Sequence, residues 1–334
     1  MKKIILLFVF IYNIAYAQVS DFKTIDFTRA DNIAKLNEGA SLNNLSLLAE
    51  ELTSKLPTEI EKFRAIHTWV CENIKADSNQ HDTVTRNRKK LQNDSLAFMN
   101  WNYEYKKIVF KKLLKHKTTM CTGYAYLIKE LCFLANLKCE IVNGYARTVD
   151  SNINKLESLN HSWNAIYLDN KWYLCDATWS SGFINSSHVF VKNYNEGYFL
   201  ADPILFAKNH YPLHKKWLLN DTLIHSKFIA GPLVYVEAFN QNLIPISPEK
   251  MVVEIKKKAE INFSLKFSKS TAIDKIALIQ ISRNKTTVLD IYDIKNENGL
   301  IQFKHLFKRK GLHDVHLKIN NEIVATYTID VTKI

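Results

Sequence analysis

The spacing of apolar residues changes near residue 220 of this 334-residue chain. Before that point, apolar side chains recur three or four positions apart, as in Phe63, Ile66, Val70 and Ile74, which predicts amphipathic helices. After it, short runs rich in β-branched residues alternate between apolar and polar positions, with Asn, Gly, Ser and Lys turns between them. About seven such runs in about 110 residues are typical of an immunoglobulin-like β-sandwich. The sequence therefore predicts an α+β region followed by an all-β sandwich.

The pattern divides the chain further. Residues 18–60 carry leucines at spacings of three and four, which predicts helices that end before Pro57. Residues 61–220 are predicted to form the α+β domain, with a strong helix over 121–136 and strands after it, and residues 221–334 the sandwich. The segment 77–100 is polar and basic, and we predict a loop there.

The first 17 residues have the features of a secretory signal peptide. Lys2 and Lys3 precede an apolar run from Ile4 to Tyr12, and a small-x-small motif ends at Ala17. The run is too short for a membrane anchor, which needs about 20 apolar residues. We therefore expect a periplasmic or secreted protein without stable membrane insertion.

Composition and charge exclude several classes of protein. With 47% hydrophobic residues, 8 Gly and 6 Pro, the chain is neither collagen-like nor disordered. Its formal charge is +12, and six lysines gather between residues 106 and 117 among apolar residues. Such a run fits a membrane-surface helix, a nucleic-acid patch or a solvated helix face beside a core-facing row. We favour the solvated face, and predict no nucleic-acid partner and no stable membrane insertion.

Two extended runs around Asp169-Asn170 predict a β-hairpin with a two-residue turn. In this register Leu168 faces Lys171, and His161 and Asp176 become diagonal neighbours on one sheet face, within side-chain reach. Such a carboxylate fixes the tautomer of an imidazole and stabilises its charged form. The hairpin therefore predicts a histidine base with an aspartate that orients it.

Cys121 is the candidate nucleophile. It follows Thr118-Thr119, a good N-cap sequence, and opens the helix predicted over 121–136, where the helix dipole favours a thiolate. That effect is worth only ~0.3–1 kcal/mol, so a neighbouring imidazolium must supply the rest of the pKa shift. Gly123 leaves a bare backbone where a substrate could approach. Together, Cys121, His161 and Asp176 predict a cysteine-dependent catalytic triad.

Three blocks that carry these residues resemble the signature motifs of the transglutaminase-like superfamily, and most closely its kyphoscoliosis-peptidase branch. They are Met120-Cys-Thr-Gly-Tyr-Ala125, His161-Ser-Trp-Asn-Ala165 and Trp172-Tyr-Leu-Cys-Asp-Ala-Thr-Trp179. Flanking stretches at residues 65–74 and 198–217 resemble the same branch, so the resemblance covers roughly residues 60–220.

The resemblance implies a papain-like core in which Cys121 attacks a peptide or amide carbonyl and forms a thioester. Water then completes hydrolysis, or an amine completes crosslinking; hydrolysis is the leading expectation. The Cys121 backbone N–H is the implied oxyanion donor, with Trp101 as a weaker second candidate, and Trp163 and Trp179 are candidate groove walls. A protein or peptide substrate and no cofactor are expected. A third possibility is a non-catalytic module that binds peptide in the groove and a partner protein at the sandwich.

The remaining cysteines and histidines carry weaker signals. Cys71, Cys132, Cys139 and Cys175 lie in apolar stretches and are predicted to be core thiols or to form one or two disulfides, since export permits oxidation. No C-x-x-C pair is present, so no zinc site is predicted. His210 and His214 are separated by Pro212, which opposes the helix that would align them on a metal.

Overall fold

The computed structural model describes residues 19–91, 93–153, 155–156, 159–220, 224–267, 272–282 and 285–333. The signal peptide expected at residues 1–17 lies outside this part of the chain. Within the described ranges, no helix combines the length and hydropathy that a membrane span requires.

Helices form the first part of the fold, as the leucine spacing predicts. Apolar residues of α2 and α3 are buried in one core, and the capping box between Thr58 and Glu61 starts α3 directly after Pro57. This core also holds Leu127, Ile128 and Leu131 of α6. The bounds are η1 Val19–Phe22, α1 Thr28–Leu36, α2 Leu45–Thr53, α3 Glu59–Asn73 and α6 Cys121–Leu134.

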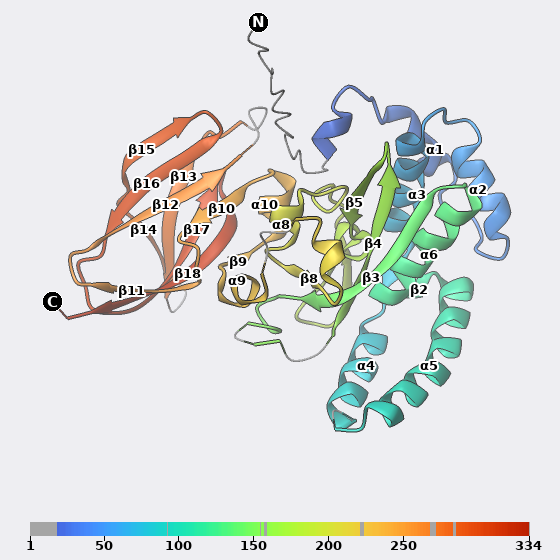
Figure 1. Ribbon diagram of the computed structural model, residues 1–334, viewed down its shortest axis with the longest axis horizontal. Coiled ribbons are helices and arrows are strands. Elements are labelled where there is room, and N and C mark those ends of the chain that lie inside the picture. The colour runs from blue at the N-terminus through green and yellow to red at the C-terminus, as the bar shows by residue number, and fades with distance from the viewer. Residues whose placement is uncertain are drawn as a thin grey trace, which may run out of the picture.

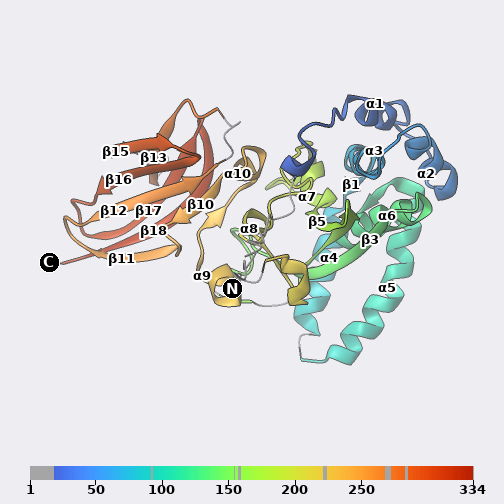
Figure 2. The ribbon, with the colours of Figure 1, turned by 45° about the horizontal axis from the view of Figure 1, so that its top comes forward.

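The loop predicted for residues 77–100 is wrong. Two helices, α4 (Ser78–Lys90) and α5 (Ser95–His116), occupy this segment and project from the body as a hairpin (Figures 1 and 2). Asp77 and Asp94 cap them, since each side chain accepts a hydrogen bond from the third backbone N–H after it. Capping and helix propensity are therefore sufficient for these two helices, although most of their length buries almost no apolar side chain.

A four-stranded antiparallel sheet in the order β5-β4-β3-β8 follows α6. The β4–β5 hairpin has the predicted register, with Leu168 opposite Lys171, and Asp169 and Asn170 both adopt positive φ. Short strands and helices connect this sheet to the last part of the chain. The bounds are β1 Lys75–Ala76, β2 Thr118–Thr119, β3 Lys138–Ala146, β4 His161–Leu168, β5 Lys171–Cys175, α7 Ala177–Ser181, β6 Gly182–Ile184, β7 Phe190–Lys192, α8 Pro203–Phe206, β8 His210–Pro212, η2 Lys215–Leu218 and α9 His225–Ala230.

The C-terminal region consists of two β-sheets packed face to face, as Phe263 and Tyr327 show with ring centroids 5.6 Å apart. One sheet has the order β10-β12-β16-β15, and the other β11-β18-β17-β13-β14 with β9 beside β18. The first of the alternating runs after residue 220, residues 233–238, forms a strand only in part, because it becomes the short strand β9 and then helix α10. The bounds are β9 Leu233–Val234, α10 Val236–Asn240, β10 Ile244–Ser247, β11 Val252–Lys256, β12 Glu260–Lys266, β13 Ile276–Ser282, β14 Lys285–Leu289, β15 Tyr292–Glu297, β16 Leu300–Leu306, β17 Gly311–Ile319 and β18 Glu322–Thr332.

The mixed region and the β-rich region lie side by side (Figure 1) and share apolar core. Tyr198 and Phe239 pack across the junction with ring centroids 4.3 Å apart. The buried Arg147 donates to the carbonyl oxygens of Gly231 and Pro232 at 2.6 and 2.9 Å. The α+β fold class, with a mixed core followed by a β-rich region, is thus confirmed.

Candidate active site

Cys121 is the first residue of α6, as predicted, but the helix is capped differently from the expectation. The N-cap is Met120, whose side chain makes no capping bond, whereas Thr118 and Thr119 form β2 beside β1. The parallel pairing with Lys75 and Ala76 fixes the position of the cysteine backbone. Cys121 is partly exposed as a residue, whereas the four other cysteines are buried.

His161, the first residue of β4, directs its Nε2 atom at Asp176, with 2.6 Å between Nε2 and Oδ2. Asp176 follows β5, one residue beyond the last paired position of the hairpin. Both side chains are buried. Because Nε2 donates to Asp176, Nδ1 is the ring atom left to face the thiol.

The two carboxylate oxygens of Asp176 perform different tasks. Oδ1 accepts hydrogen bonds from the backbone N–H groups of Thr178 and Trp179 and thereby caps α7. Oδ2 accepts from His161. The aspartate is thus held by the start of a helix while it orients the imidazole.

A second imidazole reaches the same oxygen, and the sequence analysis missed it. His210 in β8 donates from Nε2 to Asp176 Oδ2 at 3.1 Å, and its Nδ1 contacts the Asn209 carboxamide at 2.6 Å. The sheet order explains the contact, because His210 pairs with Ala146 of β3 while His161 pairs with Gly144. Only this long-range pairing brings His210 to the site, and no local pattern around Pro212 indicates it.

The pKa values of the site favour a thiolate–imidazolium pair. Burial opposes the charged form of His161, but the Asp176 carboxylate outweighs it and raises the pKa of His161 to about 10. Burial likewise opposes the Cys121 thiolate, yet the hydrogen bond and charge of His161 lower the pKa of Cys121 below its ordinary value. The charge of His161 also overcomes burial at Asp176 and holds its pKa well below the usual range. By contrast, burial lowers the pKa of His210 to about 4, so this ring is neutral at pH 7.

The other residues expected at the groove have mixed positions. Gly123 is buried, and a Cβ atom there would lie 2.0 Å from Oγ1 of Thr119, so a neighbouring side chain fills the space expected for substrate. Trp101 stacks on Tyr105 within α5, with ring centroids 4.9 Å apart, and among the described contacts none joins it to Cys121.

Trp163 and Trp179 both contact His161, but only one of them faces outward. Trp163 is 1% exposed, and its ring lies across Gly144, where a Cβ would come within 2.4 Å of the indole. Trp179 is partly exposed and packs between His161 and His210, with ring centroids 5.3 and 4.5 Å away. Trp179 is therefore the tryptophan that can line an approach to His161.

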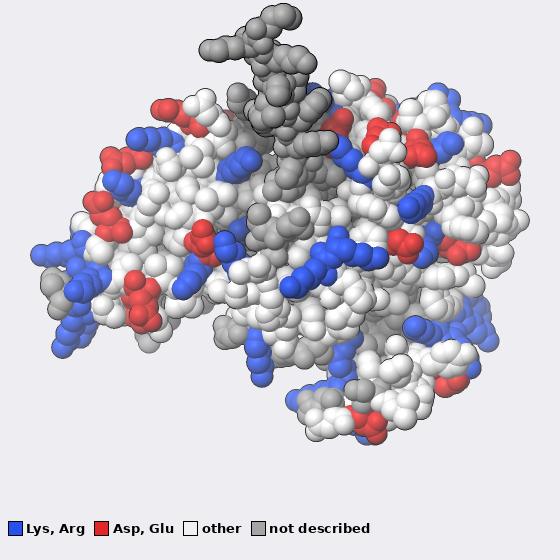
Figure 3. All heavy atoms as spheres, in the orientation of Figure 1, with Lys and Arg blue, Asp and Glu red and all other residues white. Residues whose placement is uncertain are grey.

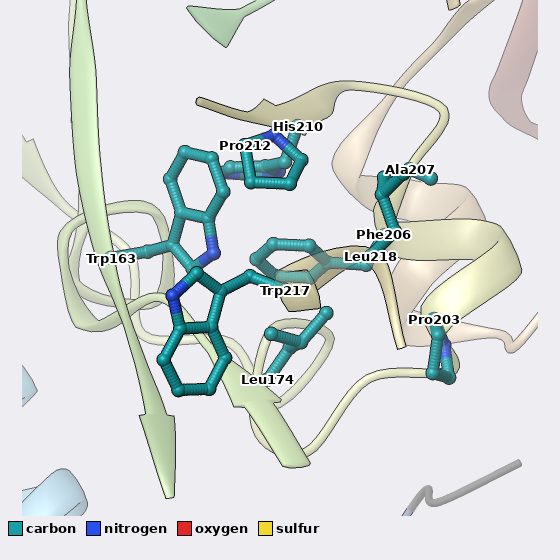
Figure 4. A pocket seen from close by; sticks show the side chains of 9 residues that line it. All are labelled: Trp163, Leu174, Pro203, Phe206, Ala207, His210, Pro212, Trp217 and Leu218. Carbon is teal, nitrogen blue, oxygen red and sulfur yellow. The ribbon is translucent and has the colours of Figure 1, made fainter. Parts of the chain in front are cut away.

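An apolar recess lies behind the site (Figure 4), with Trp163, Phe206, His210 and Trp217 among its walls. It has no room for even a water molecule. This recess therefore offers no space for a ligand.

The four other cysteines, Cys71, Cys132, Cys139 and Cys175, are buried free thiols in the structure. Burial raises the pKa values of Cys71, Cys132 and Cys175, opposite to the shift at Cys121. Among the residues whose positions are known, the side chains of His161, Asp176 and His210 form a group whose ligand atoms lie within 4.8 Å of one another. Their mutual hydrogen bonds at 2.6 and 3.1 Å already satisfy these atoms without a metal ion.

Sequence comparison relates part of this chain to one superfamily and to several of its known members. Residues 47–177 match the model of the transglutaminase-like superfamily. The chain is 32% identical over 176 residues to the kyphoscoliosis peptidase of Homo sapiens, a match that covers 52% of this chain and 24% of the relative. It is 24% identical over 206 residues to hillarin of Drosophila melanogaster, covering 58% of this chain and 23% of the relative. Thus this chain spans about a quarter of the length of the curated relatives it matches.

Among solved structures, the Lin-41 filamin domain aligns with 31% of this chain and 98% of its own length, at 10% identity and a TM-score of 0.23. The sequence relationship is the informative one, because residues 47–177 include Cys121, His161, the whole of β5 and Asp176. Residues 47–177 therefore form a transglutaminase-like domain that is related in sequence to the kyphoscoliosis peptidases.

Proposed function

We propose that this protein is a cysteine hydrolase that cleaves peptide or amide bonds through a thioester on Cys121. The observation that carries the proposal is the contact between His161 and Asp176, which raises the pKa of His161 and so supports a thiolate on the neighbouring cysteine. The names of the relatives support a peptidase, and the partial exposure of Cys121 gives a substrate access.

In this mechanism the Cys121 thiolate attacks the carbonyl carbon, and the new C–S bond produces a tetrahedral oxyanion. The backbone N–H of Cys121, at the positive end of α6, donates to that oxyanion. The imidazolium of His161 then protonates the amine as the C–N bond breaks, which leaves a thioester. Neutral His161 next takes a proton from water, and the hydroxide releases the carboxylic acid and restores the thiol pair.

The same thioester can be attacked by an amine instead of water, which would give crosslinking. The experiment incubates the protein with a glutamine-rich protein and a fluorescent amine, and measures new amino termini, released ammonia and incorporated label. The proposal predicts cleavage or ammonia release without incorporation, and loss of both in Cys121→Ser. Incorporation as the main product would replace hydrolysis by transfer. Absence of either product in the intact chain, with its Cys121 unreactive, would favour a binding module.

A further inference from the structure

The hairpin arm formed by α4 and α5, residues 78–117, carries a large share of the net charge of the chain. It contains ten Lys and Arg against three Asp and Glu, so 40 residues contribute +7 of the total +12. Blue side chains gather along α5 at the lower right of Figure 3. Among the described residues, only Lys107 and Lys112 of the ten have a carboxylate partner, Glu104 and Asp77 respectively.

The first two thirds of α5 pack only lightly. No side chain described between residues 95 and 108 is buried, and the first buried residue is Val109. The inner face is an aromatic row, in which Trp101 stacks on Tyr105 and Phe98 lies beneath the guanidinium of Arg88 at 5.9 Å. This row holds α5 against α4 and leaves the opposite face without a partner.

That opposite face is apolar. Leu96, Met99 and Tyr103 are 68%, 65% and 65% exposed, and their spacing of three, four and seven places them on one side of the helix. Lys106 and Lys107 lie one turn further along, and Lys107 also sits over the Tyr103 ring at 5.0 Å. An exposed apolar row with lysines beside it is the arrangement of helices that lie in a membrane interface.

We propose that the α4–α5 arm binds the surface of anionic phospholipid membranes, with Leu96, Met99 and Tyr103 inserted and the lysines on the headgroups. The basic charge attracts an anionic surface. The apolar row requires hydrocarbon, which a nucleic acid does not offer. If a second copy of this chain bound at this face, two arms of charge +7 would face each other. Like-charge repulsion opposes such a contact. A lipid surface satisfies both the charge and the apolar row.

The sequence analysis favoured a solvated face beside one core-facing row, because the lysine run is short and export removes most nucleic-acid partners. The structure places Val109 and Leu113 in that row but leaves Leu96, Met99 and Tyr103 outside it. The proposed contact is peripheral, so it does not depend on the catalytic function of Cys121.

The test measures co-sedimentation of the full chain with vesicles of phosphatidylcholine alone or mixed with phosphatidylglycerol. We expect binding only to the mixed vesicles, and weaker binding as salt is raised. A charge variant with Lys89→Gln, Lys90→Gln, Lys106→Gln and Lys111→Gln should lose about 10-fold or more in affinity. An apolar variant with Leu96→Ser, Met99→Ser and Tyr103→Ser should lose about 10-fold.

A matched control removes four exposed lysines from the β-rich region, Lys256→Gln, Lys257→Gln, Lys308→Gln and Lys310→Gln, and should bind like the unchanged protein. Equal losses in the control and the charge variant would overturn the proposal, as would no binding to mixed vesicles. Equally tight binding to a DNA duplex, with no loss in the apolar variant, would assign the arm to polyanions in general. Thermal unfolding of every variant must match that of the unchanged protein.

Discussion

His161 Nε2 and His210 Nε2 both lie on one oxygen of Asp176, at 2.6 and 3.1 Å, while the other oxygen caps α7. One buried carboxylate thus connects His161, the edge strand β8 and the start of α7. The consequences of removing each partner differ, and they can be measured separately.

Replacing Asp176 by Asn should remove activity and keep the fold. The amide oxygen can still cap α7, but the site loses the charge that raises the pKa of His161. Hydrolysis of a peptide substrate should fall about 10²- to 10⁴-fold, as for the equivalent change in other triads. Steady-state kinetics and far-UV circular dichroism of the variant measure the two effects. An unchanged rate would show that the aspartate is not part of the catalytic unit.

His210→Phe and His210→Gln form a matched pair. Phenylalanine keeps the stacking on Phe206, whose ring lies 4.1 Å away, but removes the hydrogen bond to Asp176; glutamine keeps a donor near the Nε2 position. Loss of one charge-assisted bond, about 1.5–3 kcal/mol, should lower kcat about 10- to 100-fold in the phenylalanine variant. The glutamine variant should recover most of that loss. Equal kcat values in the two variants would show that the ring acts by packing alone.

Acid should destabilise the fold between pH 6.5 and 4. Burial lowers the pKa of His67 to about 3 and that of His210 to about 4, so an unfolded chain, with values near 6.5, binds these protons first as the pH falls. Each histidine should therefore reduce the free energy of unfolding by up to about 1.4 kcal/mol per pH unit in this window.

Urea unfolding at pH 7 and pH 5 measures this effect. His67→Gln should decrease the difference between the two pH values, whereas His225→Gln, at an exposed position, should not. His161 acts in the opposite direction: its raised pKa stabilises the fold fully below pH 6.5, and that contribution is lost as the pH rises toward about 10. A pH-independent unfolding free energy from pH 7 to 5 would contradict the assignment of neutral buried histidines.

Gly123→Ala distinguishes packing from substrate access. The new Cβ would meet Thr119 at 2.0 Å, so we expect a loss of about 1–3 kcal/mol in stability, partly restored by Thr119→Ala. Chemical denaturation of the two single variants and the double variant measures the coupling. A stable Gly123→Ala protein with a raised KM would instead support the groove that the sequence indicated.

The sequence predicts what local pairing rules determine. Alternation of apolar residues and the Asp169-Asn170 turn are sufficient to place His161 near Asp176, because a two-residue turn leaves a single register. The helix α4 and the start of α5 were predicted as a loop because residues 78–90 have almost no apolar period, and capping by Asp77 is a weaker signal. His210 escaped prediction because only the pairing of β8 with β3, across more than 60 residues of chain, brings it to Asp176.

The central claim is that His161 ionises Cys121, and the pH dependence of Cys121 alkylation tests it most directly. Iodoacetamide labelling of this residue, followed by mass spectrometry, should reach half its maximal rate clearly below the pH of about 8.5 typical of a free cysteine. In His161→Ala the midpoint should move upward, to or beyond the free-cysteine value, because the two contributions of His161 are lost while burial and the charge of Asp176 still oppose the thiolate. A midpoint at the free-cysteine value in the unchanged protein, with no shift in His161→Ala, would contradict the account.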